Sequence, residues 1–161
     1  MKASRIAKIG VLTALIVVGR MSFTFLPNVQ PMTTILILIT LTIGLGNGLL
    51  VALLSIFISN LSLGMGVWTI AQLVSFSVII IITSLFRNYY EKIPPLLMAF
   101  HCGLMGLLYG LIISLVQAPF FGWVSFIPYY LSGIPYDFLH AFGNICFYVI
   151  LYKPLSNILK R

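Results

Sequence analysis

The charged residues of this chain are few, and their positions constrain the fold more than any other feature. Nine basic and two acidic residues separate long runs of apolar residues. Most of them lie at the ends of these runs: Lys2, Arg5, Lys8, Arg87, Glu91, Lys92, Lys153, Lys160 and Arg161. Hydrophobic residues make up 61% of the chain, more than a soluble domain of this size tolerates. We therefore expect an all-α integral membrane protein whose solvent is the lipid bilayer.

The formal net charge of +7 does not indicate a nucleic-acid partner. The basic residues flank apolar runs instead of forming a patch, which is typical of the cytoplasmic flanks of membrane spans. Cys102 and Cys146 both lie within apolar runs, so we expect packing residues and neither a disulfide nor a metal site. The first run is too long for a signal peptide and lacks a persuasive small-residue cleavage site, so we expect a retained first span.

Counting the apolar runs predicts six transmembrane helices in one domain over residues 1–161. Four runs are long enough to cross once, at roughly residues 5–24, 68–86, 95–117 and 129–152. The run over residues 32–63 is too long for one crossing and short for two. Two crossings, with a turn at Gly44, Gly46, Asn47 and Gly48, place every basic cluster on one side of the membrane. We therefore expect six spans with both termini in the cytoplasm.

This topology leaves three outer connections, at roughly residues 25–31, 60–67 and 117–128, and none of them contains Lys or Arg. The third connection is rich in aromatic residues, among them Trp123, and Tyr129 follows it. Such residues either anchor the chain at the membrane interface or cap a cavity.

Polar residues at membrane depth indicate where a binding site lies, because they are costly against lipid. Asp137, His140 and Asn144 share one face of the sixth span through their i, i+3, i+7 spacing. Arg20, near the outer end of the first run, either snorkels to water or pairs with Asp137. Other polar side chains that can converge on an outer pocket are Asn28, Gln30, Asn60 and Gln72.

Small residues recur along the first span at Ala3, Ala7, Gly10 and Ala14. This spacing of three and four residues gives one stripe, and small-residue stripes let membrane helices approach closely. The stripe either packs inside the same bundle or docks on another membrane subunit.

Motifs for catalysis are sparse. The sequence contains no GxxxxGK[ST], HExxH or GxSxG motif, and no nucleophile or metal set accompanies Asp137 and His140. Only the sixth span is strongly polar, which argues against a channel. A bundle that binds a small molecule and is not itself an enzyme fits best. A small intramembrane enzyme or a membrane assembly subunit is the alternative.

Two segments resemble a known family. PNVQPMTTI (residues 27–35) and SNLSLGMGVWTIAQ (residues 59–72) are similar to motifs of the cobalamin-type S-components, the substrate-binding membrane subunits of energy-coupling factor (ECF) vitamin transporters. The chain length, the six expected spans and the small-residue stripe also match that family's pattern. The chain departs from the second motif at Val67, Ile70 and Ala71, where the family has Pro, Pro and Trp. These departures leave the resemblance to S-components intact and bear only on which vitamin is bound.

The resemblance implies a multi-pass protein of the bacterial plasma membrane that captures a vitamin from outside. It implies docking through Ala7, Gly10 and Ala14 on a transmembrane coupling subunit that two cytoplasmic ATPases drive, and toppling of the bundle to deliver the ligand. The pocket residues that it implies are Asn28, Gln30, Asn60, Trp68, Gln72, Tyr129, Asp137 and His140.

Among ligands, a lining rich in amides and poor in net charge favours cobalamin. A folate or pantothenate carboxylate would need a free cation, and Asp137 can neutralise Arg20, the only outer candidate. Another vitamin or precursor, such as riboflavin or a queuosine precursor, is the alternative. His140 could ligate cobalt directly, although a helix-face histidine more often hydrogen-bonds within the bundle. We expect no metal or cofactor belonging to the chain itself.

Overall fold

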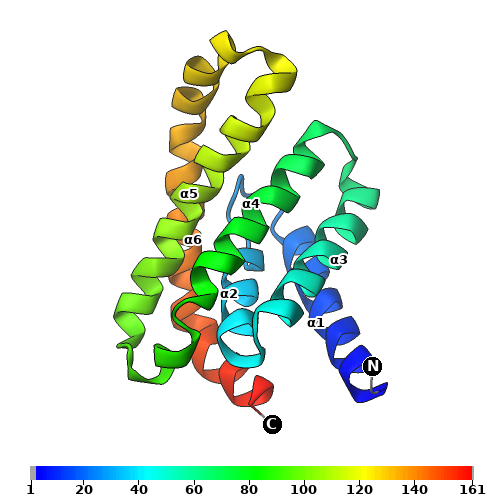
Figure 1. Cartoon of the computed structure of the whole chain (residues 1–161), viewed down its shortest axis with the longest axis vertical. Helices are drawn as coiled ribbons and strands as arrows, with labels where there is room; N and C mark the ends of the chain where they lie inside the picture. The colour runs from blue at the N-terminus through cyan, green and yellow to red at the C-terminus, as the bar shows by residue number, and fades with distance from the viewer. Residues whose placement is uncertain (1–2, 161) are drawn as a thin grey trace.

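The computed structural model describes residues 3–160, which form a bundle of six α-helices without a β-strand. The helices are α1 (Ala3–Ser22), α2 (Met32–Ile43), α3 (Leu45–Leu63), α4 (Val67–Ser84), α5 (Pro95–Phe121) and α6 (Phe126–Leu159). Two short 3-10 helices, η1 (Arg87–Lys92) and η2 (Trp123–Ser125), precede α5 and α6. Successive helices run in alternating directions, and the α5–α6 hairpin extends farthest from the chain ends (Figure 1).

The short helix α2 forms the centre of the bundle and contacts each of the other five helices. Residues 32–41 are all buried, and most of them are Thr, Ile or Leu. β-Branched residues have modest helix propensity. Away from water, however, backbone groups must bond to one another, which favours the helix. The threonine hydroxyls also find partners within the helix: Thr40 Oγ1 donates to Leu36 O at 2.8 Å, and Thr42 Oγ1 donates to Leu38 O at 2.6 Å.

Four helices are long and apolar enough to cross a membrane: α3, α4, α5 and α6. The structure is therefore consistent with an α-helical membrane protein. Helix α2 has 12 residues. At 1.5 Å per residue it is roughly 18 Å long, short of the ~30 Å hydrocarbon core. Helix α1 has 20 residues but carries three basic side chains, at Arg5, Lys8 and Arg20.

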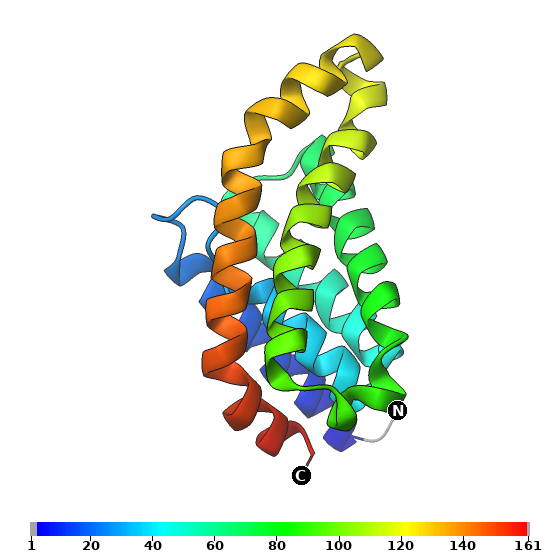
Figure 2. The same cartoon turned by 90° about the vertical axis from the view of Figure 1, so that its left-hand side faces the viewer.

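Both described chain ends lie at the same end of the bundle (Figures 1 and 2). Lys8 Nζ donates to Leu159 O at 3.0 Å, and Arg5 Nε donates to Asn47 Oδ1 at 3.1 Å, so α1 meets both the end of α6 and the start of α3. The start of α1, η1 and the last turns of α6 lie at this end (Figure 1), and these segments contain all the basic residues of the described part of the chain except Arg20: Arg5, Lys8, Arg87, Lys92, Lys153 and Lys160.

The turn between α2 and α3 is tighter than the sequence predicts. The chain reverses at Gly44 alone, whose φ of 100° lies in the region that favours glycine, while Gly46, Asn47 and Gly48 belong to the first turns of α3. The Gly44 N–H closes α2 by donating to Thr40 O at 3.1 Å.

The expected outer connection over residues 117–128 is wrong in extent. Helix α5 continues to Phe121 and α6 begins at Phe126, so both helices extend into the stretch that the aromatic and proline residues suggested to be a loop. Pro128 falls in the first turn of α6, where a helix needs no N–H donor. Likewise, α3 continues through Asn60 to Leu63, which leaves residues 64–66 as the connection to α4.

Candidate functional site

A cavity of about 380 Å³ lies between α4, α5, α6 and the α1–α2 connection, toward the end of the bundle opposite the chain ends. We call it the distal cavity. Its lining is Asn28, Trp68, Gln72, Tyr109, Gly110, Ile113, Ser114, Gln117, Tyr129, Ser132, Gly133, Tyr136 and Asp137. Tyr109 and Asp137 are buried, whereas Trp68, Tyr129 and Tyr136 are each about half exposed. The cavity therefore has a buried floor and an accessible aromatic rim.

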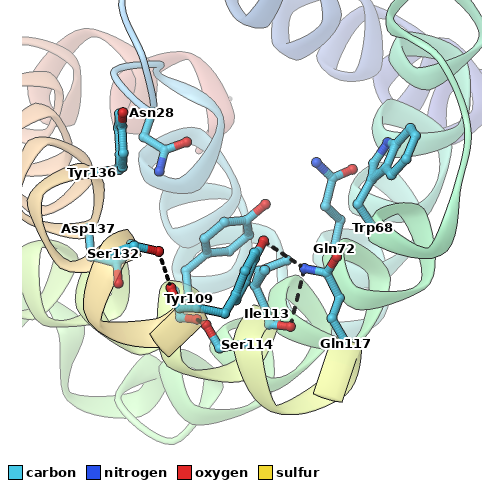
Figure 3. A pocket seen from close by; sticks show the side chains of 13 residues that line it. Asn28, Trp68, Gln72, Tyr109, Ile113, Ser114, Gln117, Ser132, Tyr136 and Asp137 are labelled. Carbon is cyan, nitrogen blue, oxygen red and sulfur yellow. Dashed lines mark hydrogen bonds between the residues drawn. The ribbon is translucent and has the colours of Figure 1, made fainter. Parts of the chain in front are cut away.

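Helical spacing supplies the lining. Trp68 and Gln72 are four residues apart on α4, and Tyr109, Ile113 and Gln117 follow the same interval along α5. In Figure 3, Trp68 and Gln72 lie on one side of the cavity, while Ser132, Tyr136 and Asp137 of α6 lie on the other. Tyr109 projects between the two sides.

Asp137 is the charged member of this lining. The residue is only 7% exposed, and no hydrogen bond or ion pair joins its carboxylate to another described residue. The carboxylate rests directly on the backbone of Gly110, where an added Cβ would lie within 2.1 Å of three Asp137 atoms. Glycine at position 110 is therefore required for α6 to present this carboxylate to the cavity.

Neighbouring polar residues hold the walls in place. Asn60 is buried, and its Nδ2 donates to Gln72 Oε1 at 2.8 Å and to Thr69 Oγ1 at 3.0 Å. Gln117 Nε2 donates to the Tyr129 hydroxyl at 3.2 Å, which links α5 to α6 across the rim. Asn60 thus orients a lining residue without lining the cavity itself.

Arg20 does not pair with Asp137, contrary to one of the sequence-based alternatives. Its Nη1 donates to Ser59 Oγ at 2.6 Å, and the Ser59 hydroxyl donates in turn to Ser55 O. The ion pair found within residues 3–160 is instead Lys160–Glu91, at the other end of the bundle. Arg20 is buried between α1 and α3 and does not line the cavity.

His140 and Asn144 face the interior, as their spacing with Asp137 predicts, but they meet α2 and α5 instead of the cavity. His140 Nε2 shares a hydrogen bond of 2.8 Å with Thr33 Oγ1, and the ring packs edge-on against Tyr109 at 4.9 Å between centroids. Asn144 Nδ2 donates to Cys102 O at 3.2 Å. Neither residue lines the distal cavity, so their substrate-binding role stays a prediction that this cavity does not support.

Two other expected pocket residues also lie elsewhere. Trp123 is 66% exposed on η2 and does not line the cavity, and neither does Gln30. Asn28, Trp68, Gln72, Tyr129 and Asp137 are the predicted residues that do line it.

Sequence reasoning missed most of the α5 and α6 lining: Tyr109, Gly110, Ile113, Ser114, Gln117, Ser132, Gly133 and Tyr136. The spacing of Tyr109, Ile113 and Gln117 was a usable signal, since intervals of four residues, like the i, i+3, i+7 spacing on the sixth span, place side chains on one helix face. Gly103, Gly106 and Gly110 were another, because their backbones pack directly on α6 and Gly106 meets the backbone of Ala141.

The small-residue stripe of α1 does not pack inside the bundle. Ala3, Ala7, Gly10 and Ala14 are all exposed, and nothing lies within 4 Å of a Cβ added at Gly10. Helix α1 instead packs through its opposite face: Ile9, Leu12, Thr13 and Ile16. The stripe is therefore a free surface of the described chain.

Comparison with protein-family models, with curated proteins and with solved structures found no match to this chain.

Proposed function

We propose that this chain is the substrate-binding S-component of an ECF-type importer, which captures a vitamin or a vitamin-like small molecule from outside the cell. The distal cavity is the observation that carries the proposal. It combines a volume suited to a small molecule with a lining of aromatic, amide and hydroxyl groups. The motifs over residues 27–35 and 59–72 contribute Asn28, Trp68 and Gln72 to that lining.

In the proposed topology all six helices cross the plasma membrane of a bacterium, and both termini are cytoplasmic. The collection of basic side chains at one end of the bundle supports this orientation, because Lys and Arg concentrate on the cytoplasmic side. The distal cavity then faces outward. Helix α2 can be short because the other five helices contact it, so the non-helical backbone that completes its crossing can lie within protein instead of lipid.

The proposed partners are a transmembrane coupling subunit and two cytoplasmic ATPases. The exposed stripe of Ala3, Ala7, Gly10 and Ala14 supports docking, because small side chains let a partner helix approach closely. The sequence has no GxxxxGK[ST] motif, so in this proposal the energy of ATP hydrolysis comes from the partner subunits.

A thermal-shift titration of the purified, detergent-solubilised chain tests the binding function. The panel is cobalamin, cobinamide, folate, pantothenate, riboflavin, thiamine and queuosine precursors, with cobalamin included because of the motif resemblance. A ligand that binds the folded chain raises its stability by RT ln(1 + [L]/Kd), so a concentration of 100 Kd adds about 2.7 kcal/mol. A saturable shift with one vitamin supports the proposal, and a folded sample that no vitamin stabilises contradicts it.

The coupling role has its own test. Gly10→Leu places bulk on the stripe and should abolish both co-purification with a coupling module and vitamin uptake, while leaving binding to the isolated chain unchanged. Leu15→Phe is the matched control, because Leu15 is 45% exposed on the same helix but lies on a different face from the stripe. Equal uptake by the two variants would remove the docking assignment.

A further inference from the structure

We propose that the distal cavity selects a compact organic cation that carries a flat ring, such as a heteroaromatic amine. This inference rests on the proposed function, since it names the chemical class of the captured molecule. It is carried by one buried carboxylate without a protein partner, placed among aromatic side chains.

The carboxylate of Asp137 lacks the partners that such a group needs. Asp137 as a residue is 7% exposed, and no described side chain or backbone N–H bonds to its carboxylate, which borders the cavity. A buried carboxylate is costly unless it is paired or hydrogen-bonded. Because Asp137 borders the distal cavity, a cationic N–H donor of a ligand can reach it and supply the missing interaction.

The rest of the lining has hydrogen-bond donors but no positive charge to balance an anion. None of the lining residues is Lys, Arg or His. Arg20 donates to Ser59 Oγ at 2.6 Å and does not line the cavity. A ligand carboxylate entering the cavity would meet Asp137 without a compensating cation, whereas an ammonium or a charged heterocycle would be attracted to it.

The other walls suit a flat ring. Trp68 stands opposite Asp137 across the cavity, and Tyr109 and Tyr136 lie at its floor and rim (Figure 3). Aromatic faces attract cations and stack on planar groups. The amides of Gln72 and Gln117 can bond to ring nitrogens or exocyclic groups of a ligand held between these walls.

The cavity volume limits the size of the ligand. Ligand pockets run from about 300 to 1,000 Å³. The distal cavity, at about 380 Å³, is near the small end of that range. A corrin macrocycle would remain largely outside it, whereas a one- or two-ring heterocycle can be enclosed.

Two probes that differ mainly in charge test the inference: 7-aminomethyl-7-deazaguanine, a cation, and 7-cyano-7-deazaguanine, its neutral counterpart. Thiamine serves as a second cation and pantothenate as an anion. Trp123→Phe leaves Trp68 as the single tryptophan, so quenching of its fluorescence reports occupancy of the distal cavity. Binding of all four probes is measured in this background.

We expect at least one of the cations to bind roughly ten- to hundredfold tighter than both the neutral probe and the anion, the range of one charge-assisted hydrogen bond. Asp137→Asn keeps the size of the side chain and should abolish that preference. Glu91→Gln removes the same charge from the other end of the bundle and should leave the preference intact.

The inference is overturned if a neutral or anionic probe binds best, if Asp137→Asn retains the cation preference, or if no probe binds to a folded sample. Failure of the proposed function is distinguished by the stripe variants and the wider vitamin panel. A chain that co-purifies with a coupling module, or that binds a non-cationic vitamin, remains an S-component with a different ligand. If the chain neither co-purifies with a coupling module nor binds any vitamin, both the proposed function and this inference are wrong.

Discussion

Two cavities of similar volume lie at opposite ends of this bundle, and only one of them has the features of a capture site. The proximal cavity, near the chain ends, measures about 360 Å³ against about 380 Å³ for the distal one. Its lining is Tyr90, Glu91, Ile93, Pro95, Tyr148, Tyr152, Lys153, Ser156, Asn157 and Lys160. Volume therefore does not distinguish the two ends, and the difference lies in how their polar groups are satisfied.

At the proximal end the polar groups bond to one another. Lys160 Nζ donates to Glu91 Oε1 at 2.7 Å, both side chains are largely exposed to solvent, and the Tyr90 hydroxyl bonds to Ser156 Oγ at 3.1 Å. At the distal end the Asp137 carboxylate is buried and has no described partner. The unpaired Asp137, and not the size of the cavity, is therefore the reason to propose the distal end as the binding end.

The largest expected effect comes from Gly110→Ala, which changes the lining of the distal cavity itself. The new Cβ would occupy the position of the Asp137 carboxylate and force it out of the cavity. We expect the ligand affinity to fall below detection and the free energy of unfolding to drop by about 1–3 kcal/mol, the usual cost of overpacking. Thermal unfolding with and without ligand measures both.

Gly133→Ala is the matched control for this variant. Gly133 also lines the distal cavity, but nothing lies within 4 Å of a Cβ added there. Its stability should stay close to that of the unmodified chain. If Gly110→Ala behaves like Gly133→Ala, then Asp137 is not held against α5 as described.

A smaller effect should separate residues that support the distal cavity from those that line it. Asn144→Ala removes the hydrogen bond to Cys102 O but no part of the lining. Stability should fall by about 0.6 kcal/mol, typical of one interhelical hydrogen bond in a membrane protein, and ligand affinity should be unchanged. Asn157→Ala, an exposed position at the proximal end, should change neither. A large loss of ligand affinity in Asn144→Ala would contradict this and show that Asn144 contributes to ligand binding.

The helical content of the fold was readable from the sequence, while the helix ends were not. Apolar runs and glycine turns predict the six helices, because a chain without water must bond its own backbone. The predicted ends of α5 and α6 differ from the observed ones because the proline and aromatic residues at positions 119–128 suggested a loop. Pro128 in fact fits the first turn of a helix. Spacing also cannot tell that the α2–α3 turn needs Gly44 alone.

The site was predicted only in part for a related reason. The i, i+3, i+7 spacing correctly placed Asp137, His140 and Asn144 on an inward face, but it specifies neither the neighbouring helix nor the depth. Thr33 of the central helix bonds to His140, and Cys102 of α5 accepts from Asn144. These partners lie 107 and 42 residues away in the chain, so only tertiary structure reveals them.

The smallest expected effect belongs to the proximal ion pair. The hydrogen bond from Lys160, with its positive charge, lowers the pKa of Glu91. The pair therefore contributes stability above the unfolded-state pKa of Glu91 and loses it as pH falls through the lowered value. Because both side chains are exposed, solvent screens the pair, and Glu91→Gln should not measurably shift the melting temperature at neutral pH. A clear destabilisation would show that the proximal end is more tightly organised than described.

The central claim is that the distal cavity faces outward and the proximal one faces the cytoplasm. Ser132→Cys and Asn157→Cys place one thiol at each cavity, and the unmodified chain, whose Cys102 is buried and Cys146 half-buried, gives the background. Labelling of intact cells with a membrane-impermeant maleimide is the measurement. Ser132→Cys should be labelled at once and Asn157→Cys only after permeabilisation. The reverse pattern, or labelling of both in intact cells, would contradict capture from outside at the distal cavity.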